Sequence, residues 1–178
     1  MQPTSELRVD CYVDADFAGL YSIKDKQTPI SVKSRTDYVI MYRGAPLHWV
    51  SKMQTQLALS TMKAEYIVLS QSMQDLIPIR EVLKEIMEVV FERESTITNH
   101  SHAKAFVDTD IGTMKYTIPQ STVYEDNNVC LQFARMLKLT PRTKHIGVPY
   151  HWFCAQVERL EICIEPIDTT QQLGNQFK

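Results

Sequence analysis

The spacing of apolar residues changes along this chain, from every second position to helical spacing, and this change limits the possible folds most strongly. From Leu7 to about Phe17, apolar and polar residues alternate, which predicts a half-buried strand. Two more strands are expected at about 37–42 and 47–51, with a turn that contains glycine and proline between them. Three successive strands joined by short links indicate an antiparallel meander.

A long helical pattern follows these strands. Apolar residues recur at helical spacing from Met62 to Val90, and Ser60 or Thr61 can cap the start of the helix. Pro78 lies inside the pattern. We therefore expect a kink or break there, because proline lacks the amide hydrogen that a helix interior uses.

The second half of the chain alternates strands with short helices. Residues 92–119 show no clear period and are interpreted as an irregular insertion. After them we expect a strand at about 121–125, short helices, a strand at about 160–165, and a last short helix capped by Asp168. This order predicts an α/β fold with one mixed five-stranded sheet flanked by helices, in a single domain over residues 1–178.

The composition narrows the class of protein. A chain of 178 residues with 44% hydrophobic and 22% charged residues can form one globular domain. The formal net charge of −2 is not that of a typical nucleic-acid binder, so such a function would depend on local basic patches. The four cysteines form no C-x-x-C pair, and we find neither a signal peptide nor a membrane-spanning run. We expect an intracellular protein of the cytoplasm, the nucleus or both, with no membrane partner and no evident obligate oligomer.

Two carboxylates stand where predicted strands end. Asp14 ends the first strand with Asp16 close behind it, and Asp126 ends the strand at about 121–125. Acids so placed can bind Mg²⁺, which prefers oxygen ligands. The alternative for Asp14 and Asp16 is a solvated strand end, and the alternative for Asp126 is the N-cap of the following helix.

Glu65 is more informative because of its position on the helix. At about 100° per residue, it falls within the apolar stripe rather than opposite it. A carboxylate there needs a partner, a metal or access to water, and a salt bridge at the edge of the stripe is the alternative. Two strand ends and the first turns of a helix packed on the sheet can converge, so Asp14, Glu65 and Asp126 can together hold a metal pair for phosphodiester hydrolysis.

Five segments, in this order, resemble the motifs of the copia-type retrotransposon ribonuclease H domain: YVDADFAG at 12–19, ALSTMKAEYIVLS at 58–70, VYEDNN at 123–128, PRTKHI at 141–146 and QQLGNQFK at 171–178. The resemblance implies an RNase H-like fold that cleaves the RNA strand of an RNA/DNA hybrid during reverse transcription. It implies Mg²⁺ as the cofactor, with Mn²⁺ as a substitute, and the reverse transcriptase domain of the same polyprotein as a partner. It assigns the catalytic and metal-binding roles to Asp14, Glu65 and Asp126.

The tail departs from the pattern of the family. Relatives usually read Q-L-A-D-x-x-T-K, and their aspartate supplies a fourth acid. Here the fourth metal position maps to Asn175, whose amide oxygen can bind a metal but adds no charge. Gly174 also weakens the expected last helix by about 1 kcal/mol relative to alanine. A degenerate, weakly active or inactive remnant that keeps the fold and at most binds nucleic acid is therefore the alternative function.

The substrate-binding residues are expected in a basic cluster near the PRTKHI segment. Lys138, Arg142, Lys144 and His145 can contact backbone phosphates there. Another basic cluster, within 24–35, is interpreted as ordinary solvated surface. Binding is expected to be independent of base sequence, because a hybrid is recognised by its A-form-like shape and its 2′-hydroxyls.

Overall fold

The computed structural model describes the backbone in five stretches, which are residues 7–21, 31–97, 118–135, 151–159 and 161–174. The chain divides into two compact units, one formed by Met1–Leu76 with Pro119–Lys178 and the other by Ile77–Ile118. The sheet and the candidate site belong to the first unit. Among the described residues, none of the helices has the length and apolar character needed to cross a lipid bilayer.

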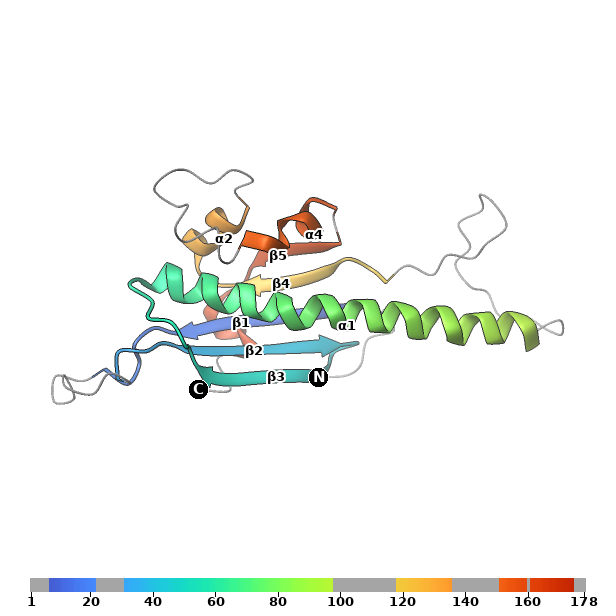
Figure 1. Ribbon diagram of the computed structural model, residues 1–178, viewed down its shortest axis with the longest axis horizontal. Coiled ribbons are helices and arrows are strands. Elements are labelled where there is room, and N and C mark those ends of the chain that lie inside the picture. The colour runs from blue at the N-terminus through green and yellow to red at the C-terminus, as the bar shows by residue number, and fades with distance from the viewer. Residues whose placement is uncertain (1–6, 22–30, 98–117, 136–150, 160, 175–178) are drawn as a thin grey trace. The chain divides into compact units, whose positions relative to one another are not determined.

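A five-stranded mixed sheet organises the first unit, in the order β3-β2-β1-β4-β5 (Figure 1). The antiparallel meander and the parallel part of the sheet meet at β1, which pairs antiparallel with β2 and parallel with β4. The predicted fold class is thereby confirmed. The strands are β1 (Val9–Asp16), β2 (Arg35–Tyr42), β3 (Ala45–Met53), β4 (Ser121–Glu125) and β5 (Ile162–Pro166).

The helices follow the predicted positions with two differences, both in the long helix. The long helix α1 (Thr61–Ile97) continues through Pro78, so the predicted break does not occur. Proline removes one helical hydrogen bond, and the turns on either side keep theirs. The helix also extends beyond Val90 into the first residues of the expected insertion. The shorter helices are α2 (Asn128–Ala134), η2 (His151–Phe153), α4 (Cys154–Glu158) and η3 (Thr169–Gln171).

Ser60 is the residue that starts α1. Its hydroxyl accepts a hydrogen bond from the Lys63 amide at 3.2 Å, and its carbonyl accepts the Ala64 amide at 3.0 Å. These bonds satisfy amides that the first turn of a helix otherwise leaves without partners. They fix the start of α1 and place Glu65 just beyond its first turn.

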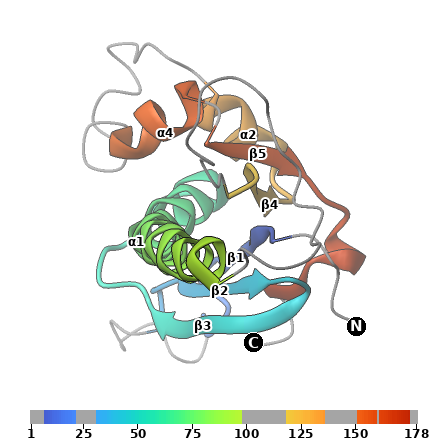
Figure 2. The same ribbon diagram turned by 90° about the vertical axis from the view of Figure 1, so that its right-hand side faces the viewer.

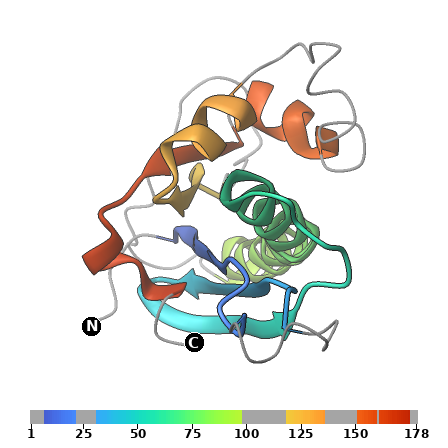
Figure 3. The ribbon, with the colours of Figure 1, turned by 90° about the vertical axis from the view of Figure 1, so that its left-hand side faces the viewer.

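The first part of α1 lies on one face of the sheet (Figures 2 and 3). The Thr36 hydroxyl of β2 donates to the Gln71 side chain of α1 at 3.0 Å. Tyr66 of α1 is fully buried, and its ring centroid lies 4.7 Å from that of Phe133 on α2 and 6.1 Å from that of Phe153 on η2. The core of the unit therefore lies between the sheet and these helices.

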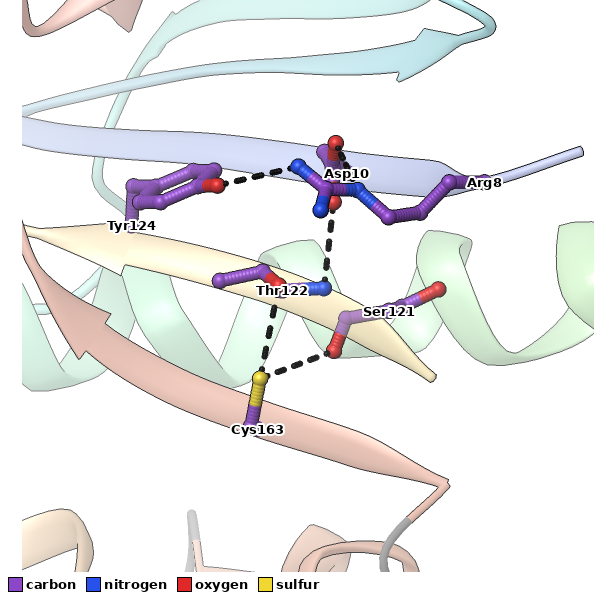
Figure 4. A network of polar contacts seen from close by, with 6 residues as sticks. All are labelled: Arg8, Asp10, Ser121, Thr122, Tyr124 and Cys163. Carbon is purple, nitrogen blue, oxygen red and sulfur yellow. Dashed lines mark hydrogen bonds and ion pairs between the residues drawn. The ribbon is translucent and has the colours of Figure 1, made fainter. Parts of the chain in front are cut away.

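The face of the sheet turned away from α1 carries a chain of polar contacts, which we call the outer network (Figure 4). Asp10 accepts hydrogen bonds from Arg8 Nε at 2.8 Å and from the Thr122 amide at 3.3 Å. Arg8 also donates to the Tyr124 hydroxyl at 3.2 Å, and the Cys163 thiol donates to the Thr122 hydroxyl at 3.4 Å. The network links β1, β4 and β5 on this face.

Candidate metal centre

Asp14 and Asp126 come from the carboxyl ends of two neighbouring parallel strands. The ladder between β1 and β4 pairs Tyr12 with Tyr124 as its last step. Asp14 lies two residues after Tyr12, and Asp126 lies two residues after Tyr124. Because the two strands are parallel and in register there, both carboxylates lie at the same end of the sheet. Figure 3 views the structure from that end.

Glu65 of α1 completes a cluster of three carboxylates at this edge. One oxygen from each of Asp14, Glu65 and Asp126 lies within 4.8 Å of the others. The side chains of Asp14 and Glu65 are buried, at 3% and 4% exposure, whereas Asp126 is half-buried. The structure thus brings together the three acids that the sequence predicted, and leaves one of them accessible from outside.

The electrostatics of the cluster fit a cation. Burial, followed by the charges of Glu125, Asp14 and Asp126, raises the pKa of Glu65 to about 10. The Glu65 Oε2 atom is buried and has no hydrogen-bond partner among the described residues. A buried acceptor that faces other carboxylates is costly in the ionised state unless a positive charge compensates it. Clustered carboxylate oxygens are the ligand set that Mg²⁺ and Mn²⁺ prefer.

Glu125 is a fourth acid near the cluster, and the sequence analysis missed it. Its side chain is fully buried, and one oxygen accepts the Asn127 amide at 3.0 Å. Burial raises its pKa to about 8, and the hydrogen bond from Asn127 offsets part of this shift. Ser121, Val123 and Glu125 lie at alternate positions of β4 and all three are buried. Only Val123 of these three is apolar, so the sequence contains no clear sign that Glu125 is buried.

Asp126 is not the N-cap of α2, so that alternative is wrong. The cap is Asn127, whose side-chain oxygen accepts the amides of Val129 and Cys130, both at 3.0 Å. Asp126 instead accepts a hydrogen bond from the Thr169 hydroxyl at 2.8 Å. With the cap supplied by its neighbour, Asp126 can turn toward Asp14 and Glu65.

Asp16 is separate from the cluster of three carboxylates. Its carboxylate lies against Gly19, where an added Cβ would come within 1.9 Å of an Asp16 oxygen. The chain turns here through Ala18, which has a positive φ of 49°. Asp16 and Gly19 line a small open pocket together with Lys33 and Arg35. Asp14 and Asp16, which are two residues apart in sequence, therefore lie in different environments.

Five predicted site residues lie outside the described part of the chain. They are the metal position Asn175 and the basic residues Lys138, Arg142, Lys144 and His145. Their roles stay predictions.

Comparison with known proteins supports both the motif resemblance and the fold. No protein-family model matches the chain. The Retrovirus-related Pol polyprotein from transposon TNT 1-94 of Nicotiana tabacum is 28% identical over 160 residues. That alignment covers 90% of this chain and 9% of the polyprotein, so the chain spans only a small part of this relative.

Solved structures of RNase H proteins share the fold at low sequence identity. LC11-RNase H1, isolated from compost, superposes with a TM-score of 0.55 at 12% identity over 96% of this chain and 92% of its own. The same protein in complex with an RNA/DNA hybrid gives 0.50 at 13% identity, over 95% of this chain and 92% of its own. The N-terminal RNase H domain of Rv2228c from Mycobacterium tuberculosis gives a TM-score of 0.51 at 11% identity, over 97% of this chain and 94% of its own. The chain is therefore similar in sequence to a part of a retrotransposon Pol polyprotein, and similar in fold to RNase H proteins.

Proposed function

We propose that this chain is the ribonuclease H domain of a copia-type element and hydrolyses the RNA strand of RNA/DNA hybrids during reverse transcription. The observation that carries the proposal is the cluster of Asp14, Glu65 and Asp126 at the carboxyl edge of β1 and β4. A solved structure of the same fold, LC11-RNase H1, is bound to an RNA/DNA hybrid, which supports this substrate class.

The three carboxylates would hold one or two Mg²⁺ ions, with Mn²⁺ as a substitute. When bound, the metal supplies Lewis-acid polarisation of the scissile phosphate and lowers the pKa of a water molecule. Asp14 and Glu65 are buried and fix the inner side of the site, whereas the half-buried Asp126 forms its accessible side. Asn175, next in sequence to the last described residue, would add a neutral oxygen ligand.

Substrate contacts are proposed for the basic residues Lys138, Arg142, Lys144 and His145. Together they provide three permanent positive charges and an imidazole for backbone phosphates, in a chain whose net charge is −2. The reverse transcriptase domain of the same polyprotein is the proposed partner, since the relative from Nicotiana tabacum is a Pol polyprotein.

A gel assay with end-labelled RNA in an RNA/DNA duplex tests the function. We expect cleavage that requires Mg²⁺ or Mn²⁺, with no cleavage of the same RNA as a single strand or of a DNA duplex. Asp126→Asn should abolish cleavage, and Asp10→Asn, the same chemical change in the outer network, should preserve it. Absence of metal-dependent cleavage, or equal cleavage by the Asp126→Asn variant, would contradict the proposal.

A catalytically weak remnant is the second candidate, and Asn175 is the observation that favours it. Loss of one acid from a metal site removes a negative charge and weakens cation binding. If the chain is such a remnant, the unaltered protein binds hybrid without cleaving it, and Asn175→Asp raises cleavage. Strong cleavage by the unaltered chain would exclude the remnant.

A further inference from the structure

The buried side chain of Gln172 connects the two strands that carry Asp14 and Asp126. Gln172 is 3% exposed, and its Nε2 donates to the Val13 carbonyl at 2.7 Å and to the Tyr124 carbonyl at 3.2 Å. The β1–β4 ladder ends at the pair of Tyr12 with Tyr124. The side-chain amide of Gln172 therefore bridges β1 and β4 where their backbone pairing ends, next to Asp14.

The same side chain holds the backbone of the tail against β1. Gln172 Oε1 accepts the Gly174 amide at 3.3 Å. A Cβ added to Gly174 would lie 3.0 Å from Asp14 Cβ and 3.3 Å from the Asp14 amide nitrogen. Gly174 thus touches the residue that bears the first carboxylate of the cluster.

Thr169 provides the contact on the other side of the cluster. Its hydroxyl donates to Asp126 Oδ2 at 2.8 Å. Thr169 follows Asp168, whose side chain accepts the Thr170 amide at 2.9 Å and caps η3. The segment 169–174 therefore contacts both aspartates of the cluster, through Thr169 and Gly174, and joins their strands through Gln172.

We propose that Thr169, Gln172 and Gly174 form a clasp that sets the spacing and orientation of Asp14 and Asp126 for a divalent cation, with Gln172 as the central positioning residue. The inference rests on the proposed function, because it concerns the same metal centre. Partners that orient metal ligands without touching the metal commonly change metal affinity about 10–100-fold when removed. The clasp gives the tail a function that does not depend on an acid at position 175.

Two variants with the same chemical change test the clasp. Gln172→Met keeps the length of the side chain but removes the donors and the acceptor, and Gln171→Met makes the same change at the exposed neighbouring residue. Mn²⁺ binding to the full chain is titrated by electron paramagnetic resonance, with thermal unfolding in EDTA as the check on folding. We expect Gln172→Met to weaken Mn²⁺ binding about 10-fold or more, and Gln171→Met to bind as the unaltered chain does.

Thr169 supplies a second test that does not depend on the stability of the Gln172 variant. Thr169→Val should weaken Mn²⁺ binding, and Thr169→Ser, which keeps the hydroxyl, should restore it. Unchanged Mn²⁺ affinity in both Gln172→Met and Thr169→Val overturns the clasp, as does equal weakening by Gln171→Met.

The clasp and the proposed function can fail separately. If the unaltered chain cleaves hybrid and both Gln172→Met and Thr169→Val bind Mn²⁺ normally, the clasp is wrong and the function stands. If the unaltered chain binds Mn²⁺ but cleaves no hybrid, the function is wrong, and weaker Mn²⁺ binding by Gln172→Met still supports the clasp. A chain that binds no Mn²⁺ overturns both.

Discussion

Asp10 and Asp14 lie on the same strand, four residues apart, in opposite electrostatic situations. Asp10 forms an ion pair with Arg8 at 2.8 Å and accepts the Thr122 amide. Asp14 is buried and faces the carboxylates of Glu65 and Asp126. The charge of Asp10 is therefore balanced by the guanidinium of Arg8, whereas Asp14 lies beside two other carboxylates.

The difference separates a structural acid from a candidate functional one. A paired carboxylate lowers the free energy of the folded state, and removing it costs stability. Carboxylates held together in a buried position raise that free energy until a cation binds. Removing a carboxylate from the cluster should therefore raise the stability of the metal-free chain, whereas removing one from the outer network should lower it. Only the cluster should depend strongly on metal and pH.

Cleavage activity should show the largest contrast. We expect Glu65→Gln to reduce the rate of hybrid cleavage by at least about 10²-fold, because the amide removes the charge that holds the metal. Asp10→Asn should stay within a few-fold of the unaltered chain, since Asp10 lies outside the cluster. Single-turnover cleavage at saturating Mg²⁺ measures both. A comparable loss of cleavage rate in the two variants would contradict the proposed difference in function between the cluster and the outer network.

The pH dependence of stability should show the next largest effect. The pKa of Glu125 is raised to about 8 and that of Glu65 to about 10, both from an ordinary value of 4.5. Above pH 4.5 the unfolded chain releases protons that the folded chain keeps. The free energy of unfolding of the metal-free chain should therefore fall as the pH rises from 4.5 toward these raised pKa values.

Urea unfolding at pH 5.5, 6.5 and 7.5 in EDTA measures this decline. Mg²⁺ should offset it increasingly toward pH 7.5, because metal binding displaces the retained protons. The Glu65→Gln variant should show a shallower decline than the unaltered chain. A metal-free stability that rises over this range is incompatible with the raised pKa values.

Two single substitutions should change the metal-free stability in opposite directions. At pH 7.5, Glu65→Gln should stabilise the chain by about 2–4 kcal/mol, because a neutral amide replaces a carboxyl that must retain its proton to stay folded. Asp10→Asn should destabilise it by about 1 kcal/mol through loss of the ion pair with Arg8. Chemical unfolding in EDTA gives both values, and shifts of the same sign would refute the contrast.

Tyr124→Phe should give the smallest effect. The change removes the hydroxyl that accepts the Arg8 hydrogen bond and leaves the ring stacked 4.7 Å from that of Tyr12. Because the Arg8 side chain is 39% exposed, we expect a loss of about 0.5 kcal/mol at most. Hybrid cleavage should be unchanged, since the Tyr124 carbonyl that Gln172 contacts is backbone. A clear loss of cleavage would show that the outer network also supports the metal centre.

Local sequence patterns located most of the elements, and together with the motif resemblance they pointed to the three acids of the cluster. Alternation located β1, helical spacing located α1, and the position of Glu65 in the apolar stripe identified a carboxylate that is indeed buried. The start of α1 was narrowed to two residues, and the structure selects Ser60. These patterns involve residues that are close together in the sequence, so they can be recognised in the sequence alone.

The remaining features depend on pairings that a local pattern does not contain. Gln172 contacts Val13 across 159 residues, and nothing near Gln172 indicates that contact. Asp126 and Asn127 are adjacent and both are favoured as helix caps, so only the packed structure shows which one caps α2. Pro78 predicts a local break, but the rest of α1 maintains the helix through it.

The parallel pairing of β1 with β4 also has a consequence for the timing of activity. It joins Asp10 to Thr122, so the central ladder closes a loop of more than a hundred residues. Contacts between such distant segments form late, because the entropy of loop closure must be overcome first. On a ribosome, Asp14 and Glu65 emerge well before Asp126, and the three carboxylates meet only once β4 has docked beside β1. The proposed nuclease would therefore stay inert until β4 has docked beside β1, and metal binding would report that docking.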